Sequence, residues 1–133
     1  MIKDKTIFTN GCFDILHHGH VELFKYCKSI GHKVIVGLNS DSSIRKLKGS
    51  TRPINDLKSR LSVLNSIKYI DEVIVFEEET PYSLIKRIKP DIIVKGGDYK
   101  AEEVPGNDLC EVRIFNYING YSTTKSIQRF NSR

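Results

Sequence analysis

The chain has 133 residues, of which 39% are hydrophobic and 28% charged, and its formal net charge is +5. This length suits one buried core, so we expect a single domain over residues 1–133. No apolar run approaches the roughly 18 residues of a membrane helix, and the first residues lack a signal-peptide pattern. We therefore expect a cytoplasmic protein without a membrane partner. Its widely spaced cysteines predict free thiols rather than disulfides or a zinc ribbon.

Short apolar runs alternate with amphipathic stretches along the chain. Strands are predicted at residues 6–9, 33–38, 72–76, 91–94 and 111–115. Helices are predicted at residues 19–29, at 42–47 after Asp41 as N-cap, from the cap Asp56 to Ile67, and at 81–88 and 122–130. This alternation predicts an α/β fold, namely a doubly wound, Rossmann-like, five-stranded parallel sheet with helices on both faces.

Four polar segments directly follow predicted strands. They are residues 10–20, 39–41, 95–98 and 119–124. Because a parallel sheet of this kind binds ligands at the carboxyl ends of its strands, we expect the four segments to meet at one edge.

Residues 10–20, with the sequence NGCFDILHHGH, are the most informative of these segments. A strand that leads through a glycine turn into a helix is typical of phosphate sites, because the helix start offers unpaired N–H groups. His17 and His20 are three residues apart and therefore share one helix face, where both can contact one ligand. Two surface histidines, or a zinc site that includes Asp14, remain the alternatives, although no His-Glu-x-x-His pattern supports zinc.

A basic run holds Arg45, Lys46, Lys48 and Arg52 within eight residues. It is either a solvated helix face or a device that attracts an anionic substrate, whose β- and γ-phosphates Lys46 or Lys48 could reach. No aromatic residues alternate with these cations, so we expect no nucleic-acid partner. The chain also lacks a Walker motif, which excludes a P-loop kinase.

Two further segments allow both a structural and a functional interpretation. Ser122, Thr123 and Thr124 open the last predicted helix as caps or as phosphate ligands. Residues 95–99, with the sequence KGGDY, form a plain turn or bring a lysine and an aspartate close to a polar substrate.

The motif from Gly11 to His20, together with residues 120–125 (GYSTTK), resembles the cytidylyltransferase-like nucleotidyltransferases over nearly the whole chain. Residues 9–14, 38–49, 52–53, 76–81 and 94–99 resemble more narrowly the adenylyltransferase domain of bacterial ADP-heptose synthase. In many bacteria that domain is fused to a heptose kinase. The sequence has no such region, so the resemblance predicts the stand-alone form.

The resemblance implies that D-glycero-β-D-manno-heptose 1-phosphate and ATP give ADP-heptose and pyrophosphate with Mg²⁺, and that the product feeds lipopolysaccharide or other surface glycans. Relatives that use CTP carry an arginine just before their Gly-x-Ser-Thr-Thr motif. Residues 117–119 (YIN) stand there in this chain, which favours ATP. A glycerol 3-phosphate cytidylyltransferase and a non-catalytic nucleotide-binding module remain the alternatives, and we expect a homodimer.

The resemblance also implies roles for single residues. His17 and His20 would stabilise the transition-state oxygens, and Lys46 or Lys48 would hold the β- and γ-phosphates. The expected nucleotide-binding residues, besides the two histidines, are Gly11, Cys12, Phe13, Asp41, Arg60, Gly97, Asp98, Ser122, Thr123 and Thr124. The expected substrate-binding residues are Asn10, Lys95 and Tyr99, and Asp14 is the candidate metal ligand.

Overall fold

A computed structural model of the chain describes residues 4–116. The predicted helix at 122–130, with Ser122, Thr123 and Thr124, lies outside these residues. One five-stranded sheet holds β1 (Thr6–Gly11), β2 (Lys33–Asn39), β3 (Glu72–Phe76), β4 (Ile92–Gly96) and β5 (Glu111–Phe115). The helices are α1 (His18–Ile30), α2 (Asp41–Lys48), α3 (Leu57–Asn65), α4 (Tyr82–Ile88) and the short 3₁₀ helix η1 (Ala101–Glu103).

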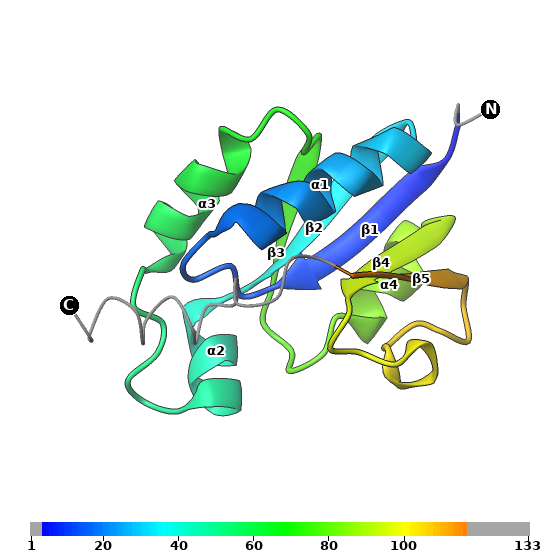
Figure 1. Cartoon of the computed structure of the whole chain (residues 1–133). Helices are drawn as coiled ribbons and strands as arrows, with labels where there is room; N and C mark the ends of the chain where they lie inside the picture. The colour runs from blue at the N-terminus through cyan, green and yellow to red at the C-terminus, as the bar shows by residue number, and fades with distance from the viewer. Residues whose placement is uncertain (1–3, 117–133) are drawn as a thin grey trace.

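The strands are all parallel and lie in the order β3-β2-β1-β4-β5 (Figure 1). The chain adds β2 and β3 on one side of β1 and then returns to add β4 and β5 on its other side. The strand order therefore reverses beside β1, and a doubly wound sheet opens a ligand crevice at the carboxyl end of such a point. The predicted fold class is confirmed.

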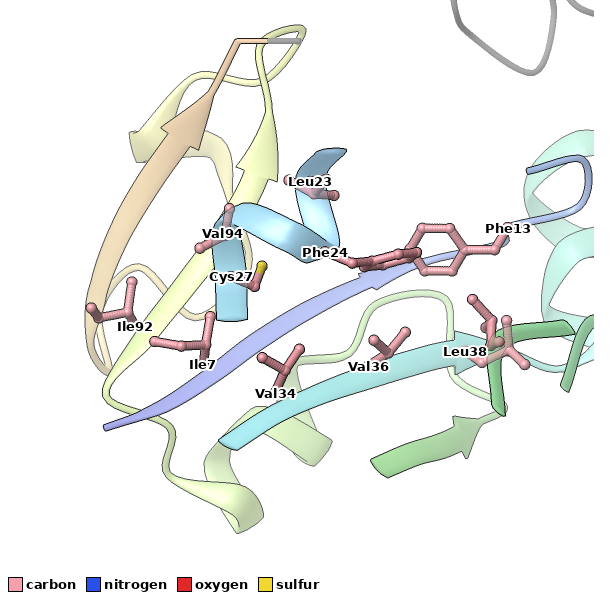
Figure 2. Close-up of a cluster of buried hydrophobic side chains, with 11 residues drawn as sticks. Ile7, Phe13, Leu23, Phe24, Cys27, Val34, Val36, Leu38, Ile92 and Val94 are labelled. Carbon is pink, nitrogen blue, oxygen red and sulfur yellow. The ribbon is translucent and has the colours of Figure 1, made fainter. Parts of the chain in front are cut away.

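Helices cover both faces of the sheet (Figure 1). On one face, apolar residues of the strands pack against α1 and α3, and Figure 2 shows Leu23, Phe24 and Cys27 of α1 over this surface. On the other face, Phe8 and Ile93 pack against Leu84 and Ile85 of α4. Successive strand residues point to opposite faces, so the continuous apolar runs serve both layers at once.

The predicted elements within residues 4–116 are all present, with shifts at some ends. β1 extends two residues further than predicted, because Asn10 and Gly11 continue the pairing with β2. α2 begins at Asp41, and its N-cap is Ser40 rather than the predicted Asp41, since the Ser40 hydroxyl accepts a hydrogen bond from the N–H of Ser43. The sequence analysis did not predict η1.

The described part of the chain contains no helix that is long and apolar enough to cross a membrane.

Candidate active site

A cleft of about 460 Å³ opens at the carboxyl edge of the sheet. Ten of the residues predicted to form the site line it: Asn10, Gly11, Cys12, Phe13, Asp14, His20, Lys48, Lys95, Asp98 and Tyr99. They come from the ends of β1 and β4, the start of α1, the end of α2 and the loop after β4. Asn39, the last residue of β2, lines the cleft as well, so the sheet brings together three of the four predicted segments.

His17 and His20 lie one over the other at the start of α1. Their rings stack with centroids 3.8 Å apart. His17 is the N-cap, and its Nδ1 accepts a hydrogen bond from the N–H of Gly19 at 3.1 Å. The Nδ1 of His20 accepts in turn from the N–H of His17 at 3.3 Å. Because each Nδ1 is an acceptor, each ring is neutral and carries its proton on Nε2.

The protonation state of His20 follows from its surroundings. Burial, followed by the electrostatic effects of His17 and Lys95, lowers the pKa of His20 to about 3. The ring of Phe13 meets His20 edge-on, with centroids 5.3 Å apart, and packs against Phe24 (Figure 2). Phe13 reaches this position with a φ of 45°, a conformation that bulky residues rarely adopt. The site thus keeps His20 as a fixed, neutral N–H donor.

Asp14 is buried, and its carboxylate holds a loop. Its carboxylate accepts hydrogen bonds from Arg52 Nε at 2.9 Å and from the N–H groups of Ile54 and Asn55, both at 2.8 Å. Burial raises the pKa of Asp14, but these hydrogen bonds outweigh it and hold the pKa below its usual value. Both oxygens are engaged, so the geometry does not support the predicted metal role.

Arg60 is buried beneath the cleft and braces its loops. Its guanidinium donates to the carbonyl oxygens of Cys12 at 3.0 Å, Asn39 at 2.7 Å and Asn55 at 3.0 Å. It also forms an ion pair with Asp41 at 2.6 Å. These contacts fix the loops that carry Cys12, Asn39 and Asn55. Neither side chain lines the cleft, so the structure does not support direct nucleotide contact by Arg60 or Asp41.

Three other predicted residues are also absent from the lining of the cleft, and one of them is His17, which stacks on the cleft-lining His20. Lys46 is exposed on α2 and does not line the cleft, whereas Lys48 does. Gly97 packs against Asn116, because a Cβ at Gly97 would lie 2.3 Å from the Asn116 Oδ1. Its neighbour Gly96 lines the cleft instead. The glycine pair therefore serves the packing of β4 as well as access to the cleft.

Sequence reasoning missed part of the lining. Arg52, Leu47, Glu79, Thr80, Pro81, Glu103 and Pro105 also line the cleft. Glu79 to Pro81 follow β3, so the rule that ligands bind after strands would have selected them. Glu103 and Pro105 belong to the region around η1, for which the sequence offers no comparable signal.

A doubly wound sheet whose switch-point cleft is lined by a neutral histidine and two lysines is typical of the class of α/β domains that bind phosphate esters. The family model described as "Cytidylyltransferase-like" matches residues 8–129, so the chain belongs to that family of nucleotidyltransferases. The resemblance noted in the sequence is thereby confirmed.

Curated relatives match almost the whole chain. It is 52% identical to "Bifunctional protein HldE" of Nitratiruptor sp. over 129 residues, 96% of this chain and 28% of the relative. It is 52% identical to the protein of the same name from Aliarcobacter butzleri over 94% of this chain and 26% of the relative. The chain thus spans little more than a quarter of these relatives.

Solved structures agree with the fold. A lipopolysaccharide core biosynthesis protein from Thermoplasma volcanium matches with a TM-score of 0.69 and 31% identity, over 86% of this chain and 96% of that one. A pantoate-beta-alanine ligase from Francisella tularensis matches with a TM-score of 0.63 and 18% identity, over 84% of this chain and 59% of that one. The second likeness concerns the fold alone.

Proposed function

We propose that the chain transfers AMP from ATP to a sugar 1-phosphate, D-glycero-β-D-manno-heptose 1-phosphate, to give ADP-heptose and pyrophosphate. The observation that carries the proposal is the stacked pair of neutral histidines, whose Nδ1 atoms are both engaged at the start of α1. The choice of ATP and of heptose rests on the resemblance to ADP-heptose synthase and on the HldE relatives. The expected homodimer stays a prediction.

The reaction needs positioning and charge stabilisation more than a base. A phosphate monoester has a second pKa near 6, so the acceptor is mostly a dianion at neutral pH. One of its oxygens forms a bond to the α-phosphorus of ATP, and the bond from that phosphorus to the bridging oxygen of pyrophosphate breaks. The enzyme must hold two anions in line and stabilise the charge that develops on the phosphoryl oxygens.

The described residues suit this task. The Nε2–H groups of His17 and His20 would donate to oxygens of the α-phosphate, and a neutral ring costs little to desolvate. Lys48 would hold the leaving pyrophosphate as a point charge from the end of α2. Arg60 and Asp14 would act indirectly, by fixing the loops around the cleft.

Mg²⁺ would enter with ATP. Within residues 4–116, no group of three or more His, Cys, Asp or Glu side chains is placed to hold a metal ion. Mg²⁺ needs few protein ligands when substrate phosphates coordinate it. We therefore assign Mg²⁺ to phosphate oxygens and name no protein residue as its ligand.

A screen of pyrophosphate release would test the proposal, with a panel of sugar 1-phosphates and glycerol 3-phosphate against ATP, CTP, GTP and UTP. We expect release with heptose 1-phosphate and ATP. Turnover of glycerol 3-phosphate with CTP would replace the proposed substrates with those of the cytidylyltransferase alternative. ATP binding without release from any pair would indicate a non-catalytic module.

A further inference from the structure

We propose that Lys95 binds the phosphate of the acceptor, so that the cleft holds acceptor and leaving group with separate lysines. The inference rests on the proposed function and deepens it. Lys95 follows Val94 in β4, is 6% exposed, and lines the cleft.

Among residues 4–116, the surroundings of Lys95 contain hydrogen-bond acceptors but no ion-pair partner. Its Nζ donates to the carbonyl oxygen of Asn10 at 2.9 Å and lies 3.4 Å from the Asn10 Oδ1. It also stands 4.5 Å from the centre of the Tyr99 ring. None of the carboxylates in the described part of the chain forms an ion pair with it.

The other buried charged side chains in the described part of the chain have ion-pair partners. Three charged side chains are buried among residues 4–116, namely Asp14, Arg60 and Lys95. Asp14 is paired with Arg52, and Arg60 is paired with Asp41. A buried ammonium without an anion is costly, and folding alone gives no reason to keep one. A ligand anion that enters the cleft would supply the missing partner.

The charge state of Lys95 is compatible with this role. Burial lowers the pKa of Lys95 to about 8, against the opposing effects of Asp98 and Cys12. The side chain therefore remains mostly protonated at neutral pH. A bound phosphate would favour the charged form further.

The sheet order separates Lys95 from Lys48. β2 leads into α2, which ends at Lys48, whereas Lys95 belongs to β4, and these two strands flank β1 on opposite sides. His17 and His20 stand at the start of α1, which follows β1. They therefore come from the strand that lies between β2 and β4 in the sheet. In-line displacement places the incoming and leaving oxygens on opposite sides of phosphorus. One lysine from β4 and one from the helix that follows β2 match that requirement.

The neighbours of Lys95 favour a sugar monophosphate over a triphosphate. Asp98 and Glu103 line the same cleft, and their carboxylates accept hydrogen bonds from hydroxyl groups but repel additional phosphates. One buried cation beside acidic side chains therefore fits a polyhydroxylated ester with one phosphate. The exposed cations of α2 fit the pyrophosphate.

Steady-state pyrophosphate release with each substrate varied would test the inference in the Lys95→Met variant. We expect its KM for the sugar 1-phosphate to rise about 10- to 100-fold, the worth of one charge-assisted hydrogen bond, while its KM for ATP stays within about twofold. The ligand-free variant should unfold at the same temperature as the parent or a higher one, because a buried unpaired charge has been removed. Lys28→Met is the matched control, since Lys28 pairs with Asp71 away from the cleft and both kinetic constants should stay unchanged.

A rise in the KM for ATP with an unchanged KM for the acceptor would overturn the assignment. Chemical rescue gives a second readout: ethylammonium ions should lower the acceptor KM of Lys95→Ala, and a purely structural lysine would show no such rescue.

The failure of the proposed function can be told apart from the failure of this inference. If no sugar 1-phosphate supports turnover, a second experiment decides whether Lys95 binds phosphate. In it, inorganic phosphate is titrated by calorimetry into the ATP-saturated parent, Lys28→Met and Lys95→Met proteins. Binding that weakens at least tenfold only in Lys95→Met supports the phosphate site. Equal binding by all three proteins, or none by the parent, overturns it.

Discussion

The N–H of His17 donates to Nδ1 of His20, so the two histidines of the site are joined through the backbone as well as through their stacked rings. The His17 side chain closes the other half of the capping box with the backbone of His20, and its Nδ1 also accepts from the N–H of Gly19. Capping the helix thus sets the tautomer of each ring and leaves Nε2–H as its donor.

Substitution of His20 by Asn and by Gln should separate capping from catalysis. The Asn amide oxygen can replace Nδ1 as the cap acceptor but leaves no donor near Nε2, whereas a Gln amide reaches the Nε2 position and leaves the cap unfilled. We expect His20→Asn to lose about 10²–10³ in kcat. We expect His20→Gln to retain more activity but to lose about 1 kcal/mol of stability. Pyrophosphate release gives the kcat of both variants, and urea unfolding gives their stability. Full activity of His20→Asn would remove His20 from the mechanism.

His20 should remain neutral through the physiological pH range. Its folded pKa is about 3, below the ordinary value of 6.5, so the unfolded state binds the extra proton first. The stability that His20 contributes is therefore fully present above pH 6.5 and declines as the pH falls towards 3. NMR titration should show no movement of the His20 ring signals between pH 8 and 5. A midpoint near 6.5 for His20 would contradict the buried, neutral ring.

Lys48 and Lys46 should differ in importance although they are two residues apart. Lys48 lines the cleft and Lys46 does not. We expect Lys48→Met to lower kcat/KM for ATP about 10- to 100-fold, through loss of a charge-assisted contact to phosphate. Lys46→Met, which removes the same charge from the same helix, should change it by less than about threefold. Equal losses in both variants would mean that ATP is attracted by the overall charge of α2 and not bound by a defined contact with Lys48.

Asp14→Asn tests whether this carboxylate holds the loop or a metal ion. Loss of the ion pair with Arg52 and of one loop hydrogen bond should destabilise the fold by about 1–3 kcal/mol. The Mg²⁺ concentration that gives half-maximal activity should stay as in the parent. A raised Mg²⁺ requirement together with an unchanged melting temperature would restore the metal role.

Arg60→Met should be among the most damaging single changes outside the cleft. It leaves buried carbonyl oxygens of Cys12 and Asn39 without their donor, and Asp41 without its partner. We expect a loss of about 3–5 kcal/mol in the free energy of unfolding. Lys58→Met, on the exposed face of the same helix, is the control and should be nearly neutral. A small effect at Arg60 would mean that its contacts do not support the loops.

The sequence by itself determined the strands, the order of helices and strands, and the segment that carries the histidines. Short apolar runs bounded by glycines and caps are local patterns, and a parallel sheet follows from their alternation. His17 and His20 were identifiable from their spacing of three residues, although His17 is the N-cap of α1 and meets His20 through the capping box rather than on a shared helix face.

Only the tertiary structure decided what the buried charges do. Asp14 looked like a metal ligand until Arg52 and the N–H groups of residues 54 and 55, some 40 positions away in sequence, were seen to occupy its oxygens. The sequence allowed Lys95 either a turn role or a role in substrate binding, and the structure showed that β4 extends through it and buries it without an ion-pair partner among residues 4–116. Pairing and burial depend on contacts between distant segments, and the spacing of residues along the chain does not predict these contacts.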